Sequence, residues 1–152
     1  MTTPRWLGAL VLAVWALSLA APVFTTCAPG YDHVPGIVLL LLGWFGVFAL
    51  TPAWFANFLI VWIGARLLFR RRPPVWLGGL AVVIAGTALW WKAWGDDTGE
   101  RPICHYHAGY YLWLASALLA LVATVVAEQS QSRSQSRPAP AASGSGVDGR
   151  LL

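Results

Sequence analysis

Four stretches of almost uninterrupted apolar residues dominate the chain, and the polar segments between them alternate in basic content. The stretches are 6–24, 52–69, 75–94 and 109–127, each close to the roughly 20 residues that an α-helix needs to cross about 30 Å of hydrocarbon. Because backbone in lipid must satisfy its hydrogen bonds internally, these segments are expected to be helices. The pattern predicts an all-α membrane protein, a four-transmembrane-helix bundle over residues 1–127.

A fifth apolar segment, residues 36–50, directly precedes the second span. Residues 36–69 would form a single helix of about 51 Å at about 1.5 Å per residue, too long for one crossing. Thr51-Pro52 is typical of a helix start, a hydroxyl cap followed by proline at the first helical position. We therefore expect 36–50 to be a short interfacial or re-entrant helix. The alternative is one long, tilted helix kinked at Pro52.

Basic residues indicate the orientation of the predicted bundle. With a cytoplasmic N-terminus, eight of the ten arginines and lysines lie inside, and only Lys92 and Arg101 lie outside. This bias predicts a multi-pass protein of a bacterial inner membrane with both termini in the cytoplasm.

A run of three arginines follows the second span, and Pro73-Pro74 and the third span come directly after it. This position predicts contact with anionic lipid headgroups rather than nucleic acid. The expected headgroup contacts are Arg70, Arg71 and Arg72.

The two ends of the chain allow separate predictions. Arg5, the apolar run 6–17 and the small residues 18–20 resemble a cleaved signal peptide, but tryptophans within the run favour a retained span. After Ala127 the composition changes to Ser, Gln, Pro, Ala and Gly, so residues 128–152 are predicted to be a disordered cytoplasmic tail.

Small residues recur at helical spacing in three spans, which lets helix backbones approach closely in lipid. These faces are predicted to point inward. They comprise Ala9, Ala13, Ala16 and Ala20 in the first span, Gly78, Ala81, Ala85 and Ala88 in the third, and Ser116, Ala120, Ala123 and Ala127 in the fourth.

Asn57 is the polar residue of greatest interest within the spans. It shares a helix face with Ala53 and Gly64, so its amide is expected at a helix interface, where burial demands a hydrogen-bond partner. A structural inter-helix contact is favoured over a substrate path. No charged residue lies deep in a predicted span, which argues against a proton-coupled pump.

Ten tryptophans are many for 152 residues, and most fall at the predicted membrane interfaces. An aromatic belt explains them. The outer group is also a candidate lining for a groove that binds a small hydrophobic ligand.

The two cysteines, Cys27 and Cys104, fall in the two predicted outer connections, where an oxidising compartment favours a disulfide. Thiol exchange is the functional alternative, as in four-helix membrane thiol oxidases. Those enzymes carry a Cys-x-x-Cys pair, and this sequence has none.

Three histidines lie on the same predicted side as the cysteines, and a disulfide between the outer connections would draw them together. Imidazole suits zinc or copper, but no metal-binding spacing such as His-Glu-x-x-His is present. We therefore predict no metal and no cofactor, with His33, His105 and His107 as the candidate ligands if one binds.

Gly43-Trp44, the Trp-x-Ala-Asn element at 54–57 and the Tyr/Trp-rich segment 109–116 resemble elements of small uncharacterised bacterial polytopic inner-membrane proteins. The resemblance covers roughly 36–127 and implies no known activity.

These features predict a non-enzymatic integral membrane protein, a structural or accessory subunit. Its expected partners are membrane lipids and another membrane protein or a second copy of itself. The alternatives are an outward-facing module that binds a metal or a small hydrophobic ligand, and a membrane immunity or transport accessory.

Overall fold

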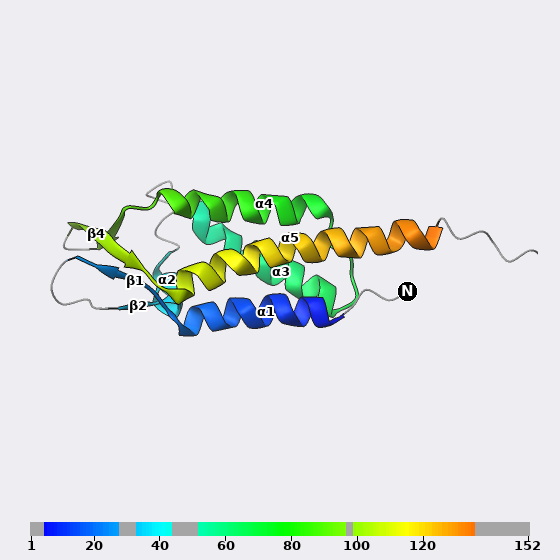
Figure 1. The fold of residues 1–152 in the computed structure, drawn as a ribbon, viewed down its shortest axis with the longest axis horizontal. Helices are drawn as coiled ribbons and strands as arrows, with labels where there is room; N and C mark the ends of the chain where they lie inside the picture. The colour runs from blue at the N-terminus through cyan, green and yellow to red at the C-terminus, as the bar shows by residue number, and fades with distance from the viewer. Residues whose placement is uncertain (1–4, 28–32, 44–51, 97–98, 136–152) are drawn as a thin grey trace, which may run out of the picture.

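The computed structural model describes residues 5–27, 33–43, 52–96 and 99–135, which form a helical bundle with a small sheet at one end (Figure 1). The long helices run along the longest axis of the molecule, and the first described helix begins at the end away from the sheet. In chain order the elements are α1 (Arg5–Ala20), β1 (Pro22–Thr26), β2 (Val34–Pro35), α2 (Gly36–Leu42), the 3-10 helix η2 (Pro52–Phe55), α3 (Ala56–Leu68), α4 (Val75–Gly86), the 3-10 helix η3 (Thr87–Trp90), β3 (Ala93–Asp96), β4 (Gly99–Tyr106) and α5 (Ala108–Gln135).

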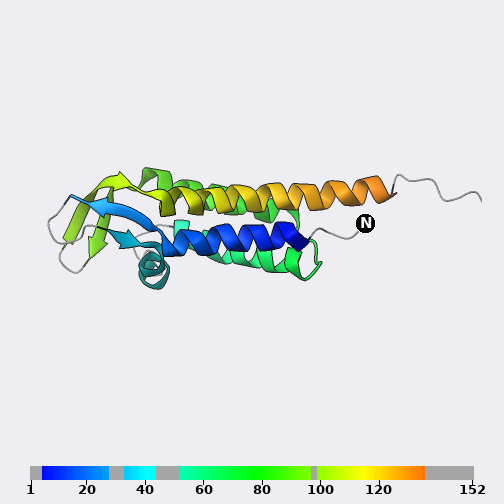
Figure 2. The same ribbon diagram turned by 60° about the horizontal axis from the view of Figure 1, so that its bottom comes forward.

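The bundle is built around α5, which packs against α1 and α4, while α3 packs against α1 and α4 on the other side (Figure 2). Its buried face is rich in small residues. Buried hydroxyl groups there are satisfied within their own helices, since Ser116 donates to the Trp113 carbonyl and Thr124 to the Leu121 carbonyl. The buried side chains are Leu7, Val11, Ala56, Ile60, Ile63, Leu67, Ala81, Ala85, Ala117, Ala120, Ala123 and Ala127.

Two of the three predicted small-residue faces are buried. One lies on α4 and η3, and the other lies on α5. The prediction for α1 was wrong, because all four of its alanines are exposed. Instead α1 buries Leu7, Gly8, Val11 and Ser18. A Cβ on Gly8 would lie 2.6 Å from the Gly64 carbonyl oxygen, so one glycine sets which face of α1 meets α3.

A four-stranded antiparallel sheet, in the order β2-β1-β4-β3, closes one end of the bundle. The predicted helical architecture is confirmed in part, since the described structure is mostly helical. The sheet departs from an all-α fold, and the first and third predicted spans ran too far. α1 ends at Ala20, because Pro22 and the β-branched residues that follow favour extended backbone. At the other edge, Asp96 pairs with Gly99 to close the β3–β4 hairpin.

The sheet is joined to the bundle by a second cluster of buried side chains. Phe24 of β1 is almost completely buried there. The cluster comprises Val23, Phe24, Val34, Ala53, Ala88 and Tyr110.

The segment predicted as a helix over 36–50 begins as α2, which ends at Leu42; residues 44–51 lie outside the described part of the chain. In one continuous helix, residues 40 and 54 would lie about 21 Å apart along the axis. Here the Trp54 indole donates to the Leu40 carbonyl at 2.9 Å. The single long helix is excluded by this contact, and η2 begins at Pro52 as the sequence indicates.

Within the described residues, one helical stretch, Ala108–Ser130, is long and apolar enough to cross a membrane. Shorter apolar helices cover Arg5–Ala20, Pro52–Leu68 and Val75–Trp90. α5 continues to Gln135, so the helix extends into the segment predicted to be a disordered tail from residue 128. Residues 136–152 of that tail lie outside the described part.

Candidate functional site

The amide of Asn57 joins three helices near the sheet end of the bundle. Its Oδ1 atom accepts hydrogen bonds from the indole Nε1 atoms of Trp15 on α1 and Trp113 on α5, both at 3.0 Å. Its Nδ2 atom donates to the Trp54 carbonyl at 2.9 Å. The inter-helix contact expected at Asn57 is thus made to two tryptophans at once, and the amide uses both its donor and its acceptor group.

Around this amide lies an apolar cavity of about 60 Å³, the volume of a very small molecule. Its lining includes Trp91, Gly109 and Tyr110, together with Gly36 and Leu39 of α2. Its size excludes a drug-sized ligand, which needs roughly 300 Å³ or more.

A second and larger hollow, about 710 Å³, opens along α3. It shares Trp54 and Asn57 with the small cavity and extends to Ala65 of α3 and Leu77 of α4. Its lining is almost wholly apolar and aromatic. A volume of this size suits a hydrophobic ligand.

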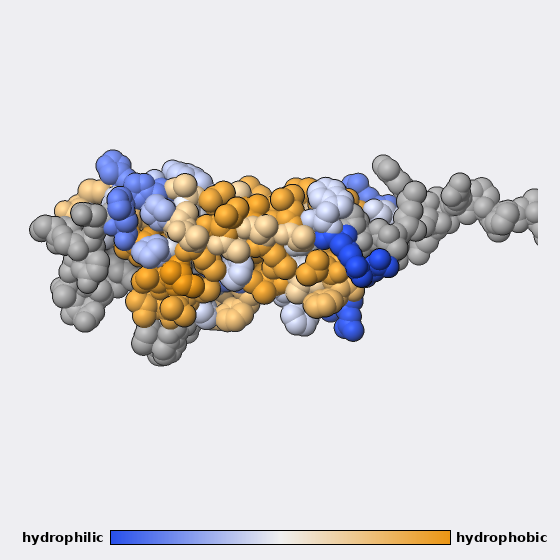
Figure 3. Space-filling model, turned by 90° about the horizontal axis from the view of Figure 1, so that it is seen from below, coloured by the Kyte–Doolittle hydropathy of each residue, from blue (hydrophilic) through white to orange (hydrophobic). Residues whose placement is uncertain are grey.

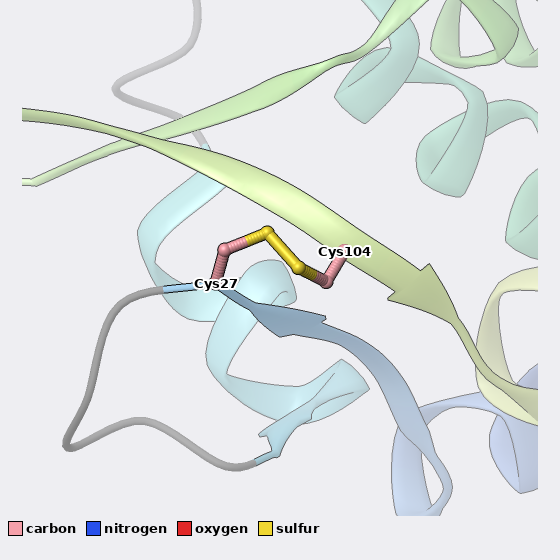
Figure 4. Close-up of a disulfide and its surroundings, with 2 residues drawn as sticks. All are labelled: Cys27 and Cys104. Carbon is pink, nitrogen blue, oxygen red and sulfur yellow. A yellow bond between two sulfur atoms is a disulfide. The ribbon is translucent and has the colours of Figure 1, made fainter.

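The predicted disulfide between Cys27 and Cys104 is present, with the two Cα atoms 5.3 Å apart (Figure 4). It joins the end of β1 to β4, beside the pair Thr26 and Ile103 and the backbone hydrogen bond from Cys27 to Pro102. Both cysteines are exposed, and the described residues contain no free thiol. A bond placed across two hydrogen-bonded strands holds their register.

The structure brings two of the three candidate histidines together. The rings of His33 and His107 meet edge to face with their centroids 5.4 Å apart, and His107 Nε2 is buried without a hydrogen-bond partner in the described residues. His105 lies within β4, paired with Thr25 of β1. Among the described residues, no group of three or more His, Cys, Asp or Glu side chains is placed to hold a metal ion.

Tyr106, at the end of β4, ties the sheet to the C-terminal end of η3. Its hydroxyl donates to the Trp91 carbonyl, and its ring packs on Tyr110 with centroids 4.4 Å apart. Burial, and to a lesser extent the nearby Tyr111, raises the pKa of Tyr106 above its ordinary value. The phenol therefore stays protonated and keeps its donor at all physiological pH values.

The arginines at the far end of α3 are arranged by a helix-terminating turn. Arg71 N–H bonds the Arg66 carbonyl at 2.7 Å and Arg70 N–H bonds the Leu67 carbonyl at 3.1 Å, the pattern of a Schellman motif. Arg70 occupies the left-handed position with φ 58°, where glycine is the usual residue. Arg70, Arg71 and Arg72 are all exposed.

Sequence reasoning missed the partners of Asn57 and the large hollow beside it. Trp15 and Trp113 were assigned to a span and to an aromatic belt, and each lies more than 40 residues from Asn57 in sequence. A buried indole N–H and a buried amide each need a hydrogen-bond partner, and this requirement could have suggested that they pair. Arg66 was counted only for orientation, although its Nε atom is buried without a hydrogen-bond partner among the described residues.

Comparison with known proteins gave no match, whether with protein families, with curated proteins or with solved structures.

Proposed function

We propose that this chain is a non-enzymatic, multi-pass protein of a bacterial inner membrane that acts as a structural or accessory subunit through association with lipid and other membrane proteins. In this proposal α1, η2–α3, α4–η3 and α5 all cross the bilayer. The disulfide-linked sheet lies on the outer face, and the arginine-rich end faces the cytoplasm. No residue is assigned a catalytic role, and no cofactor is required.

The observation that carries the proposal is the distribution of residue sizes in the bundle. The inward faces of α4 and α5 consist largely of alanine, whereas large apolar side chains point outward, including Trp62, Trp76, Val83 and Leu118, each more than half exposed. Soluble proteins bury such side chains and rarely expose contiguous apolar patches. Small residues between helices and large ones outside suit a lipid environment.

The surface supports the same interpretation. Figure 3 shows an apolar band over the helices, with hydrophilic residues at the sheet end and strongly hydrophilic residues at the opposite end. The described arginines of that opposite end are Arg5, Arg66, Arg70, Arg71 and Arg72. This placement follows the excess of positive charge on the cytoplasmic side of membrane proteins.

The three shorter helices need a reason to share the depth of α5. Each has 16 or 17 residues, about 24 to 26 Å at 1.5 Å per residue, slightly less than the hydrocarbon thickness. α1 and α4 pack directly on α5, and α3 packs between them. If α5 crosses the membrane, its packed neighbours lie in the same slab, where local thinning of the bilayer accommodates a short helix.

Extraction of membranes tests both parts of this proposal. The chain should stay in the pellet after an alkaline carbonate wash, because an embedded bundle is not released by breaking electrostatic contacts. After mild detergent extraction and crosslinking, it should migrate with a stoichiometric partner or as an oligomer. Release by carbonate would contradict the membrane assignment, and a crosslink-resistant monomer would contradict the accessory role.

A further inference from the structure

The large hollow along α3 runs toward a cation. It is lined by Trp54, Phe58 and Trp62, which follow one another at intervals of about one helical turn, and by Ala65, which comes last of these in sequence. From Trp54 to Ala65 the chain rises about 16 Å, close to the thickness of one bilayer leaflet. Phe58 and Trp62 are 58% and 55% exposed, so the lining faces outward from the bundle.

Arg66 follows Ala65 directly, at the end of this apolar surface. Its guanidinium carbon lies 5.7 Å from the centroid of the Trp62 ring, which itself lines the hollow. Its Nε atom is shielded from solvent and has no hydrogen-bond acceptor in the described part of the chain. The Nε atom itself is out of reach of a headgroup, but Arg66 as a whole is partly exposed. A phosphate oxygen is the acceptor that arginine binds best.

The turn after Arg66 adds positive charge at the same end. Arg70 adopts a left-handed conformation, with φ 58°, that is strained for a residue other than glycine. Strain retained at one position motivates a functional explanation. Here the strained turn keeps an arginine where glycine is the usual residue, beside two further arginines.

We propose that this hollow binds one anionic phospholipid of the inner leaflet, with an acyl chain against Phe58 and Trp62 and the phosphate on Arg66. This inference rests on the membrane assignment proposed above, and it adds a defined lipid and a defined headgroup residue. A transmembrane helix of a partner fits less well. Helices associate in lipid through small residues that allow close approach, whereas this surface presents bulky aromatic rings.

Lipid binding by the purified full-length chain, measured by native mass spectrometry in detergent, tests the proposal. The probes are dioleoyl phosphatidylglycerol, dioleoyl phosphatidylcholine and inorganic phosphate. The wild type should retain one phosphatidylglycerol with about fivefold preference over phosphatidylcholine, the effect expected of one arginine near an anionic headgroup. Inorganic phosphate should not displace it, because the acyl chain contributes most of the binding.

Two pairs of variants locate the site. Arg66→Gln should abolish the preference for phosphatidylglycerol, whereas Arg5→Gln, which removes an exposed arginine at the same end, should keep it. Ala65→Phe should block binding of both lipids by filling the hollow. Val83→Phe, on an exposed position of α4 outside the hollow, should not.

Equal effects within either pair would overturn the proposal, as would displacement by inorganic phosphate, which indicates a free-anion site. Loss of a co-extracted polypeptide in Ala65→Phe would also overturn it and assign the hollow to a partner helix. Carbonate extraction separates this inference from the proposed function. A chain retained in the membrane without lipid preference contradicts only the lipid site, whereas a released chain contradicts the membrane assignment itself.

Discussion

The helical bundle and the sheet end of this molecule bury different kinds of residue. In the bundle, the buried faces of α4 and α5 consist mainly of alanine, including Ala81, Ala85 and Ala120, and aliphatic side chains of α1 and α3 complete the core. At the sheet end, two aromatic side chains, Phe24 and Tyr110, are buried, and a disulfide joins the strands. Large apolar residues in the core are typical of a structure that folds against water. The proposed membrane arrangement places the first region in lipid and the second in water, which would account for this difference.

Close backbone approach should dominate the stability of the bundle, and two adjacent glycines on α4 test this. A Cβ on Gly78 would lie 2.8 Å from the Leu121 Cα atom, whereas a Cβ on Gly79 meets nothing within 4 Å. Gly78→Ala should destabilise the detergent-solubilised protein by about 3 kcal/mol. Gly79→Ala should be neutral or slightly stabilising, because alanine favours the helix. Thermal melting followed by circular dichroism compares them, and equal melting temperatures would contradict tight α4–α5 packing.

The Asn57 amide lies where the two regions meet, and its loss should have the next largest effect. Asn57→Leu leaves the indole N–H groups of Trp15 and Trp113 without their acceptor, a cost of about 2 to 3 kcal/mol. Tryptophan fluorescence should shift, because both indoles change environment. Asn57→Gln is a control that keeps the amide. A purely steric role would make the glutamine variant as damaging as the leucine variant.

The disulfide should stabilise the sheet end more than the bundle. Replacing both cysteines with serine should cost about 2 kcal/mol, less than the roughly 4 kcal/mol that the chain-entropy model gives for a loop of this length, because the packed helices already restrict the chain. Hydrogen exchange should increase in β1 and β4 and remain unchanged in α4 and α5. A uniform increase across all elements would show that the two regions unfold as one unit.

Tyr106 gives the smallest expected effect and a pH signature. Tyr106→Phe removes the hydrogen bond to the Trp91 carbonyl and should cost about 1 kcal/mol. Because burial raises the pKa of Tyr106 in the folded state, the folded protein holds this proton more tightly than the unfolded chain. Its contribution is complete below pH of about 10 and is lost as the pH rises above that value. A melting curve series from pH 8 to 11 should show this loss in the wild type, and the phenylalanine variant should show a smaller one.

The helices were more predictable from the sequence than the sheet, for physical reasons. Long apolar runs and Pro52 located the helical regions, and the cysteine pairing followed from two thiols on one predicted side. Residues 22–24 are as apolar as the preceding helix, so hydropathy alone extended the first span through β1. Alanine spacing did not predict which face of α1 is buried, because the close approach of Gly8 to the Gly64 backbone determines that face.

The candidate site was predictable only in part. The position of Asn57 on an inner helix face followed from its spacing to Ala53 and Gly64. Its two tryptophan partners and the position of Arg66 beside Trp62 depend on how the helices pack, which periodicity does not specify. The pairing of His33 with His107 depends on the sheet, which hydropathy did not predict.

The measurement that tests the central claim most directly is the side of the membrane on which each end of the molecule lies. In intact cells, a membrane-impermeant maleimide should label Cys27 and Cys104 only after an impermeant reductant opens their disulfide. A single cysteine introduced as Arg71→Cys, in a chain whose native cysteines are serine, should be labelled only after permeabilisation. Labelling of Arg71→Cys in intact cells, or of the native cysteines only after permeabilisation, would contradict a bundle that spans the membrane with its sheet outside.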